Sequence, residues 1–384
     1  MFENLINFYD SFLSMGVPGF DLAIYLDGEC ILRHKAGFSD LENRVPIRGD
    51  ERYNIYSCSK PITCVAAMQL WEKGLFSLEE RLSDYMEEFA EMHVKMPDGT
   101  LKKAENPILI RHLFEMTAGF NYDTCSPAVK TCRQETDGAC QTRDFMRYLA
   151  REPLCFEPGA QWNYSLCHDV LAALVEVITG KRFGLYVQKN IFEPLGMTQS
   201  TFLLPEEEIS TLAGQYRFTA DRQVQNIGRH IGGYKFGYAY ESGGAGAISS
   251  VDDYIRFLEA LRIGDKILAR DTVTLMATDR LSDGQRATYN TRETHGYGLG
   301  VRTPKPEKTP LFTEFGWGGA AGAYLSVDRT HGLSIYHAQH MLSSPNQAIR
   351  GYAYRFVMAE LFGHEGFKKQ LKESPITENY TLTY

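Results

Sequence analysis

The chain has 384 residues, of which 43% are hydrophobic and 23% charged, and its formal net charge is −8 at pH 7. This length exceeds what one hydrophobic core usually organises, so we expect two lobes. The negative charge is spread along the chain and argues against nucleic acid or an anionic membrane as a partner.

The amino terminus predicts a cytoplasmic protein, because it has no basic start, no apolar run of signal length and no small-residue cleavage site. No apolar stretch is long enough to span a bilayer. In a reducing compartment the eight cysteines are expected to be free thiols. The spacing of Cys125, Cys132 and Cys140 is also too wide for a zinc knuckle. We therefore expect neither a metal nor a cofactor.

The first third of the chain predicts a hairpin and a buried helix. Asp27-Gly28 separates two short apolar runs, 22–26 and 30–34, and such a pair is typical of a β-turn between strands. Residues 61–71 are apolar nearly all round, which indicates a helix inside the protein rather than on its surface. Gly74 is expected to end this helix.

The middle of the chain, from about 78 to 209, has a mainly helical pattern. It includes an amphipathic helix over 169–178 that Gly180 is expected to stop. Residues 214–240 are rich in glycine, arginine and tyrosine, a composition typical of a loop that covers neighbouring structure.

Strand patterns return in the last third, after a helix that follows Val251-Asp252-Asp253 and runs to Leu261. The strand-like runs cover 297–302, 323–327 and 333–337, a long helix is expected over 346–362, and the polar tail 364–384 has the composition of a disordered segment. Strands at both ends with helices between them predict an α/β fold with a helical insertion. The expected α/β domain is discontinuous and comprises 1–80 and 245–384, while 81–244 forms the helical insertion with its covering loops.

Ser57-Cys58-Ser59-Lys60 is an S-x-x-K motif at the start of the expected buried helix, and no other serine here has a lysine three positions on. Residues three apart share a helix face, so the lysine amine can reach the serine hydroxyl. Lys60 must be neutral to accept a proton, and burial together with the positive helix end disfavours its charged form. Taken alone, the motif is also typical of an N-cap serine with a solvent-facing lysine.

Two further motifs carry residue types that acyl transfer needs. Tyr164, in the turn before the helix at 169–178, can carry protons beside a neutral lysine, although a tyrosine that anchors a turn gives the same pattern. Residues 315–322 are rich in glycine, which lets a backbone approach a substrate and offer N–H groups to an oxyanion. They also fit a loose dinucleotide pattern, but a strand-like run follows where a helix is required.

Two further sequence features bear only weakly on the location of a functional site. His337 and His340 are close enough in sequence to share a metal, but no carboxylate accompanies them, so core or surface roles are favoured. The chain has no G-x-S-x-G motif, which argues against the α/β-hydrolase type of serine enzyme.

Taken in order, these motifs resemble the serine β-lactamase and penicillin-binding protein superfamily, and most closely the class C β-lactamase-like proteins and family VIII carboxylesterases. The matching segments are 56–63, 110–113 with 117–119, 191–197, 242–246 and 297–300. The resemblance implies a β-lactamase-like α/β fold, an antiparallel sheet flanked by helices with an inserted, mainly helical domain. It also assigns catalytic roles to Ser57 as nucleophile, Lys60 as base and Tyr164 as proton carrier.

The sequence departs from the family at two places. The family's Tyr-x-Asn element reads Tyr164-Ser165-Leu166 here, and His168 and Asp169 are the candidates to replace the missing asparagine. The β-lactamase Lys-Thr-Gly element reads Trp317-Gly318-Gly319, which removes a cation that would attract a carboxylate. This substitution resembles the esterase branch, in which these three residues contact an uncharged substrate group.

The resemblance therefore predicts hydrolysis of a small carboxylic ester through an acyl-enzyme on Ser57. The N–H groups of Ser57 and Ala320 are the expected oxyanion donors. Acyl transfer on the same residues is the nearest alternative, and β-lactam or D-peptide hydrolysis is a weaker one. A different class, a catalytically silent scaffold, is disfavoured because the three catalytic residues are all present.

Overall fold

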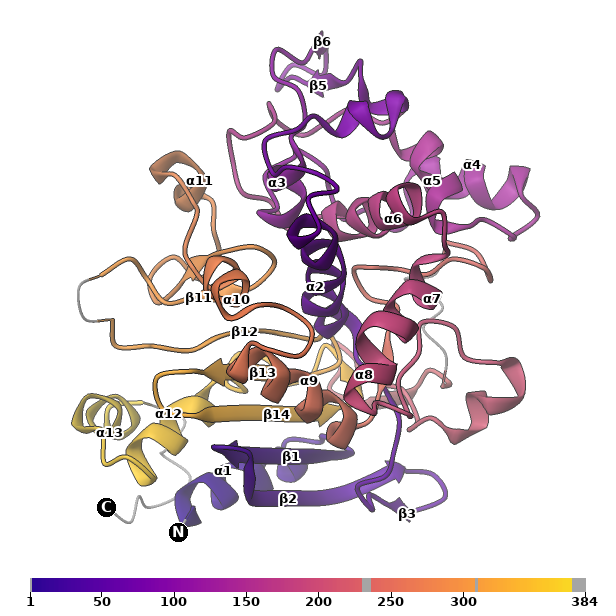
Figure 1. The fold of residues 1–384 in the computed structure, drawn as a ribbon. Coiled ribbons are helices and arrows are strands. Elements are labelled where there is room, and N and C mark those ends of the chain that lie inside the picture. The colour runs from indigo at the N-terminus through magenta and orange to yellow at the C-terminus, as the bar shows by residue number, and fades with distance from the viewer. Residues whose placement is uncertain (1, 230–235, 308–309, 375–384) are drawn as a thin grey trace.

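The computed structural model describes residues 2–229, 236–307 and 310–374. One antiparallel sheet, in the order β10-β11-β12-β13-β14-β1-β2-β3, lies at one end of the molecule, and a mainly helical part lies at the other (Figure 1). Its strands are β1 Gly19–Leu26, β2 Glu29–Asp40, β3 Val45–Pro46, β10 Gly296–Tyr297, β11 Arg302–Thr303, β12 Phe315–Gly318, β13 Tyr324–Asp328 and β14 Leu333–Gln339. The predicted α/β fold class is confirmed.

The helices come from all parts of the described chain. They are α1 Glu3–Ser14, α2 Ser59–Glu72, α3 Ile110–Phe114, α4 Pro127–Glu135, α5 Thr142–Leu149, α6 Cys167–Thr179, α7 Phe183–Val187, α8 Glu193–Leu195, α9 Val251–Ile263, α10 Arg270–Met276, α11 Asp283–Ala287, α12 Tyr352–Glu360 and α13 Glu365–Lys372. Smaller sheets pair β4 Tyr53–Asn54 with β9 Ile248–Ser249, β5 His93–Lys95 with β6 Leu101–Lys103, and β7 Tyr216–Phe218 with both β8 Val224–Asn226 and β15 Met341–Leu342.

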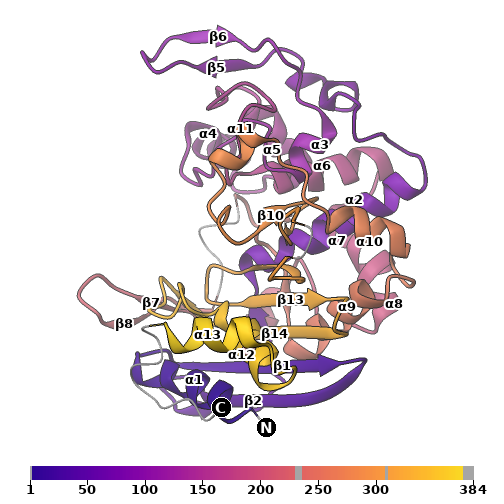
Figure 2. The same ribbon diagram turned by 90° about the vertical axis from the view of Figure 1, so that its left-hand side faces the viewer.

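Helices cover both faces of the large sheet. Side chains along each strand alternate between the two faces, so neighbouring residues of one strand belong to different cores. Leu22 and Ile24 of β1 belong to the core that α1 and α12 complete, whereas Ala23 belongs to the core that includes α9. Figure 2 shows α12 and α13 in front of the sheet and α9 beyond it. The Asp27-Gly28 turn between β1 and β2 has positive φ at both residues, 49° and 91°, as the sequence predicted.

Helix α2 runs from the sheet into the helical part, where it packs against α6 (Figure 1). Every residue from Ser59 to Leu70 is buried, which confirms the prediction from its all-round apolar pattern. Gly74 just beyond it and Gly180 at the end of α6 both have left-handed backbones, with φ of 68° and 64°, as the predicted helix ends require.

Cys132 and Cys140 form a disulfide, so the expectation of free thiols is wrong for this pair. A turn in which Asp137 and Gly138 have positive φ brings the end of α4 back toward the start of α5 and places the two sulfurs together. The remaining six cysteines are free.

Four other expectations are corrected. The strand over 297–302 is two short strands with a tight turn between them, and the helix over 346–362 forms only from Tyr352 to Glu360. Residues 345–351 form turns instead, in which the Asn346 side chain hydrogen-bonds Gln339 at the end of β14. Segment 214–240, expected to be a loop, contains the β7–β8 hairpin, although 230–235 lie outside the described residues. The polar tail, expected to be disordered, begins with helix α13, and 375–384 also lie outside the described part.

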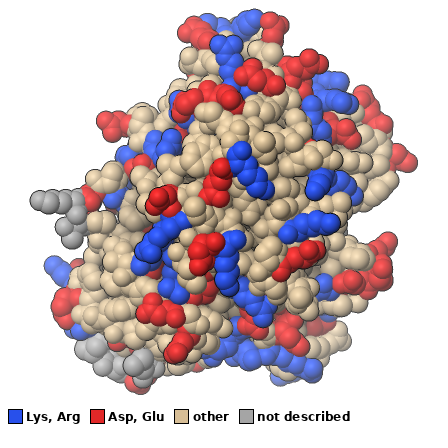
Figure 3. All heavy atoms as spheres, viewed as in Figure 1, with Lys and Arg blue, Asp and Glu red and all other residues tan. Residues whose placement is uncertain are grey.

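The surface mixes charges of both signs. On the face shown in Figure 3, lysine and arginine side chains alternate with aspartate and glutamate side chains rather than forming a patch of one sign. Among the described residues, no helix has the length and apolar character needed to cross a membrane.

Candidate active site

Ser57 lies in a single 3-10 turn, Tyr56–Cys58, directly before α2. Tyr56 has a positive φ of 48°, a backbone conformation that a tyrosine rarely adopts. The turn is held in place because Ser59 Oγ donates to Tyr56 O at 2.6 Å and Tyr56 Oη donates to Gln215 Oε1 at 2.6 Å. As a result, Ser57 reaches a cavity at the end of α2 while 8% of its surface stays exposed.

Lys60 is completely buried one helical turn below Ser57. Its Nζ donates to three oxygens: Gly244 O at 2.7 Å, Ser57 Oγ at 3.3 Å and Tyr122 Oη at 3.4 Å. The helix spacing therefore does bring the amine to the serine hydroxyl, and the solvent-facing alternative for this lysine is wrong.

Glycine is required at positions 243 and 244, which lie against helix α2. A Cβ at Gly243 would lie 2.3 Å from His168 O, and one at Gly244 would lie 2.5 Å from Asp169 Oδ2. Because such distances are too short for any real side chain, only glycine lets the carbonyl of Gly244 approach Lys60. This close approach explains the Ser-Gly-Gly-Ala-Gly motif at 242–246.

Tyr164 Oη lies 2.5 Å from Ser57 Oγ. The Tyr164 ring stacks on that of Tyr122, with ring centres 5.0 Å apart and planes inclined by 17°. Both rings are also close to the Lys60 amine, at 4.5 and 5.0 Å from their centres. The segment that carries Tyr122 is fixed because Leu166 N–H donates to Asn121 O at 3.0 Å.

Tyr122 is a site residue that the sequence reasoning missed. It lies in an irregular segment between α3 and α4, where no periodic pattern points to one face. The available signal was its place three residues after Thr117-Ala118-Gly119, a segment already matched to the family.

Neither candidate replaces the missing asparagine by contacting Lys60 directly. Leu166, where the family has that asparagine, is buried in the core. Asp169 Oδ1 accepts hydrogen bonds from Ser242 Oγ at 2.7 Å and Tyr240 Oη at 2.9 Å, and burial raises the pKa of this carboxyl group. Asp169 thereby holds the segment that leads to Gly244, whose carbonyl takes the hydrogen bond from Lys60.

His168 does not serve as a base in this arrangement. Its Nε2 lies 3.4 Å from Phe114 O and 3.5 Å from Cys64 Sγ. Burial, with a smaller contribution from the charge of Lys60, lowers the pKa of His168 to about 3. The imidazole is therefore neutral at physiological pH.

The end of strand β12 lies against the Ser57 turn. A Cβ at Gly319 would lie 2.5 Å from Ile55 O, so glycine allows the two backbones to meet. Gly319 N–H donates to Ala323 O, whereas no backbone acceptor pairs with Ala320 N–H among the described residues. The N–H group of Ala320, which lines the same cavity as Ser57, is thus available to a ligand.

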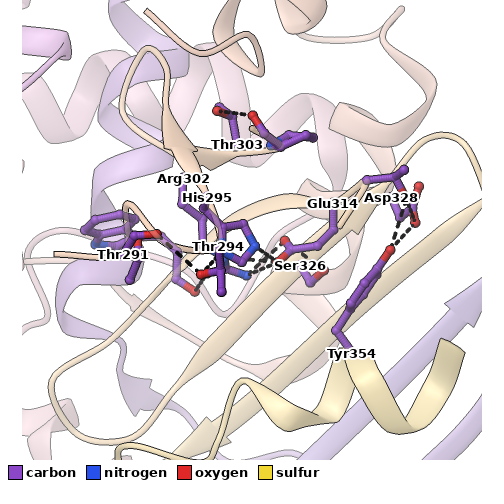
Figure 4. A network of polar contacts seen from close by, with 12 residues as sticks. Thr291, Thr294, His295, Arg302, Thr303, Glu314, Ser326, Asp328 and Tyr354 are labelled. Atoms are coloured by element: carbon purple, nitrogen blue, oxygen red, sulfur yellow. Dashed lines mark hydrogen bonds and ion pairs between the residues drawn. The ribbon is translucent and has the colours of Figure 1, made fainter. Parts of the chain in front are cut away.

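A buried ion-pair network around Arg302 and Glu314 contacts the backbone of Trp317. Figure 4 shows Arg302, Glu314, His295 and Ser326 of this network. Arg302 binds both oxygens of Glu314, at 2.9 and 3.0 Å from Nη2, and also donates to Trp317 O at 3.1 Å. Glu314 accepts further hydrogen bonds from His295 Nε2 and Ser326 Oγ, each at 3.1 Å. The proximity of Arg302 keeps the pKa of Glu314 below its usual value in spite of burial.

The Trp317 indole faces the reacting groups. Its ring stacks near that of Tyr164, with centres 6.0 Å apart, and meets the edge of Tyr297 at 5.3 Å. The loss of the Lys-Thr-Gly element suggested that the loop after Trp317 has no positive charge nearby. This expectation is wrong. Arg350 Nη1 donates to Gly319 O at 2.5 Å, which places a guanidinium group at this end of the cavity.

These groups surround one cavity of about 410 Å³. Its lining residues are Ser57, Tyr122, Trp162, Tyr164, Tyr289, Asn290, Thr291, Arg302, Trp317, Gly318, Gly319, Ala320, Gln347 and Arg350. Aromatic rings form much of the wall, which suits an apolar substrate group. Of the residues predicted as catalytic groups, oxyanion donors or the Trp-Gly-Gly element, all except Lys60 line the cavity, and Lys60 lies beneath Ser57.

The sequence leaves two roles open for the aromatic residues Tyr234, Phe236, Tyr238 and Tyr240: an apolar wall for the substrate, or packing against the helical part. Phe236 packs against Phe145 with ring centres 4.7 Å apart, and Tyr240 is buried beside Asp169. Tyr238 is 74% exposed, and Tyr234 lies outside the described residues. In what the structure describes, this segment therefore packs on the helical part rather than lining the cavity.

The two histidines considered for a metal do not form a site. His340 Nδ1 contacts Gly214 O at 2.5 Å, and His337 is buried among Tyr9, Phe12 and Phe20. No group of three or more potential metal ligands is found in the part of the chain that the structure describes.

A serine and a lysine one helical turn apart, at the base of a cavity beside an antiparallel sheet, define a β-lactamase-like serine hydrolase. Residues 7–355 match the family described as Beta-lactamase, and the chain belongs to this family.

Proteins similar to this chain include esterases. Esterase EstB of Burkholderia gladioli is 31% identical over 335 residues, which cover 80% of this chain and 82% of that protein. The solved structure of EstCE1, a hydrolase with promiscuous acyltransferase activity, gives a TM-score of 0.72 at 26% identity and covers 91% of this chain and 97% of its own. Simvastatin synthase LovD from Aspergillus terreus, at 22% identity, 94% and 98% coverage and a TM-score of 0.75, supports the fold alone.

Proposed function

We propose that this protein hydrolyses small carboxylic esters through an acyl-enzyme on Ser57. The observation that carries the proposal is the convergence of two groups on one hydroxyl: Tyr164 Oη at 2.5 Å and Lys60 Nζ at 3.3 Å from Ser57 Oγ. Both contacts lie at the wall or base of the 410 Å³ cavity. The 31% identity to an esterase supports an ester as the substrate.

In the acylation step, Ser57 Oγ forms a bond to the ester carbonyl carbon and its proton passes to Lys60, directly or through Tyr164. The N–H groups of Ser57 and Ala320 stabilise the negative charge on the carbonyl oxygen. The bond to the alcohol oxygen then breaks, and the alcohol leaves with a proton returned through Tyr164.

In the deacylation step, water takes the place of the alcohol. The Lys60 and Tyr164 pair accepts a proton from the water, whose oxygen bonds to the acyl carbon. The bond from that carbon to Ser57 Oγ breaks and the serine recovers its proton. The products are a carboxylic acid and free enzyme, so no cofactor is required.

Acyl transfer to an alcohol or amine is the second candidate. It uses the same steps, with the acceptor in place of water, and is supported by the promiscuous acyltransferase activity of EstCE1. A cavity of 410 Å³ has room for an acceptor beside a short acyl group. Adding an acceptor alcohol to the assay and measuring ester product against free acid separates transfer from hydrolysis.

The test of the proposal is kcat/KM for p-nitrophenyl esters of increasing chain length, measured beside nitrocefin on one preparation. We expect a short ester to be the better substrate, because the aromatic cavity wall suits an uncharged acyl chain. If nitrocefin is better, the protein is a β-lactamase. If neither reacts and a fluorophosphonate probe fails to label Ser57, it is a silent scaffold.

A further inference from the structure

A second cavity of about 300 Å³ adjoins the active-site cavity next to Trp317. The two cavities share the lining residues Thr291, Arg302, Trp317, Gly318, Gln347 and Arg350. A substrate bound at Ser57 can therefore extend past Trp317 into this second cavity, which we call the side pocket. Arg355, from helix α12, lines the side pocket but not the active-site cavity.

Cations outnumber anions in the side pocket. Three guanidinium groups, those of Arg302, Arg350 and Arg355, line it together with one carboxylate, that of Glu314. Glu314 is fully engaged, because it receives hydrogen bonds from Arg302, His295 and Ser326 (Figure 4). It therefore neutralises Arg302 and leaves the other two arginines uncompensated.

Arg350 and Arg355 form no ion pair with the described residues. Arg350 donates to Gly319 O, a neutral acceptor, and burial lowers the pKa of its guanidinium group. Arg355 lies over the ring of Tyr352, 4.0 Å from its centre, and its buried Nε has no hydrogen-bond partner in the described part of the chain. Two partly desolvated cations without counter-charges are costly unless an anion joins them.

The rest of the molecule makes this local excess of cations unusual. The chain as a whole carries a formal net charge of −8, and on the face in Figure 3 the two signs are intermixed. A positive pocket in a negative protein selects an anion that fits the pocket, and it raises the local concentration of that anion. A guanidinium group presents paired N–H donors that match a carboxylate.

We propose that the side pocket binds a carboxylate that the ester substrate carries several bonds away from its reacting carbonyl, with Arg350 and Arg355 as its partners. This inference rests on the proposed function and narrows its substrate class to acidic esters, such as monoesters of dicarboxylic acids. The reacting carbonyl sits at Ser57, the chain passes Trp317, and the remote carboxylate reaches the two arginines. The reaction itself is unchanged, because the carboxylate only binds.

The kinetic test compares mono-p-nitrophenyl adipate with p-nitrophenyl hexanoate, which has the same chain length but ends in a methyl group. We expect the acidic ester to be preferred in kcat/KM by about tenfold or more at low salt, and the preference to shrink as salt screens the ion pairs. Arg355→Met should remove most of the preference while leaving the rate for the neutral ester unchanged. Arg147→Met, a change at an exposed arginine of α5, is the matched control and should behave as the wild type.

Arg350→Met is a second variant that should lower the preference for the acidic ester. It also removes a hydrogen bond to Gly319, so we expect it to slow hydrolysis of the neutral ester as well. The inference is overturned if wild-type enzyme prefers the neutral ester, or if neither arginine variant lowers the preference for the acidic one.

A binding measurement keeps this inference separate from the proposed function. Free adipate should raise the melting temperature of the wild type, and Arg355→Met should abolish the rise, whether or not any ester is hydrolysed. Absence of ester hydrolysis with this stabilisation intact would reject the esterase and keep the pocket. No stabilisation by adipate, or a larger one by inorganic phosphate, would reject a carboxylate as the occupant.

Discussion

Tyr164 Oη lies closer to Ser57 Oγ, at 2.5 Å, than the amine of Lys60 does, at 3.3 Å. The phenol is thus the immediate neighbour of the nucleophile, and the lysine lies beneath both. The rings of Tyr164 and Tyr122 flank the amine, so a proton leaving Ser57 has two short routes.

Replacing Ser57 by alanine removes the proposed nucleophile without disturbing the fold, since the serine side chain is small and makes no hydrogen bond to the backbone of the described residues. We expect kcat/KM for esters to fall on the order of 10⁴-fold or more. Intact-mass analysis with a slow ester should show one adduct, at Ser57, and none in the variant. An adduct at another residue would reject this assignment.

Replacing Lys60 by methionine keeps the length of the buried side chain but removes the proton acceptor. Acylation should slow by about 10³-fold while the melting temperature stays near that of the wild type. Lys60→Arg should be similarly inactive, because a guanidinium group cannot accept the proton. A methionine variant that still forms the acyl-enzyme at the normal rate would make Lys60 structural.

The two tyrosines should differ in their effects. Tyr164→Phe removes the hydroxyl next to Ser57 and should lower turnover by about 100-fold or more. Tyr122→Phe loses the longer contact of 3.4 Å to Lys60, and we expect a loss of less than about tenfold. The double variant tests whether the two hydroxyls act on the same proton. Equal losses in the two single variants would contradict the proposed division of roles.

Gly244→Ala should impair catalysis through the position of Lys60. The new methyl group would lie 2.5 Å from Asp169 Oδ2 and 3.4 Å from Lys60 Nζ, so the carbonyl that receives the lysine must move. We expect at least a tenfold loss in kcat and a destabilisation of about 1–3 kcal/mol.

Gly284→Ala is the matched control for Gly244→Ala. Position 284 lies in α11, and the nearest atom to its Cβ would be 3.7 Å away. The control should therefore keep full activity. If both alanine variants are equally active, the close approach at Gly244 has no catalytic importance.

Asp21 is expected to make the free energy of unfolding depend on pH. Burial raises the pKa of this carboxyl from 3.8 to about 6, although Arg33 pairs with it at 2.7 Å. The folded protein therefore binds more protons than the unfolded chain between these values. The stabilisation from this group is complete below about pH 4 and is lost as pH rises through 6.

Asp21→Asn tests this sign, because the amide does not titrate. Relative to the wild type, the variant should be more stable at pH 7 than at pH 4 by on the order of 2–3 kcal/mol. Denaturant unfolding of both proteins at the two pH values measures the difference. A difference that does not change with pH would show that Asp21 titrates normally.

The sequence by itself determined the elements whose contacts are local. Asp27-Gly28 set the hairpin turn, the all-round apolar pattern marked α2 as buried, and the spacing of Ser57 and Lys60 put both on one helix face. Each of these features depends on residues within a few positions of one another, and the geometry of a turn or a helix fixes such contacts.

The tertiary structure decided which distant groups complete the site. Tyr122 and Gly244, the other partners of the lysine amine, lie 62 and 184 positions from Lys60 in sequence. Arg350 returns a positive charge to a loop that had lost its lysine. No local pattern encodes such pairs, because they form only when α2, the 242–246 segment and the end of β12 pack together and bury their backbones against one another.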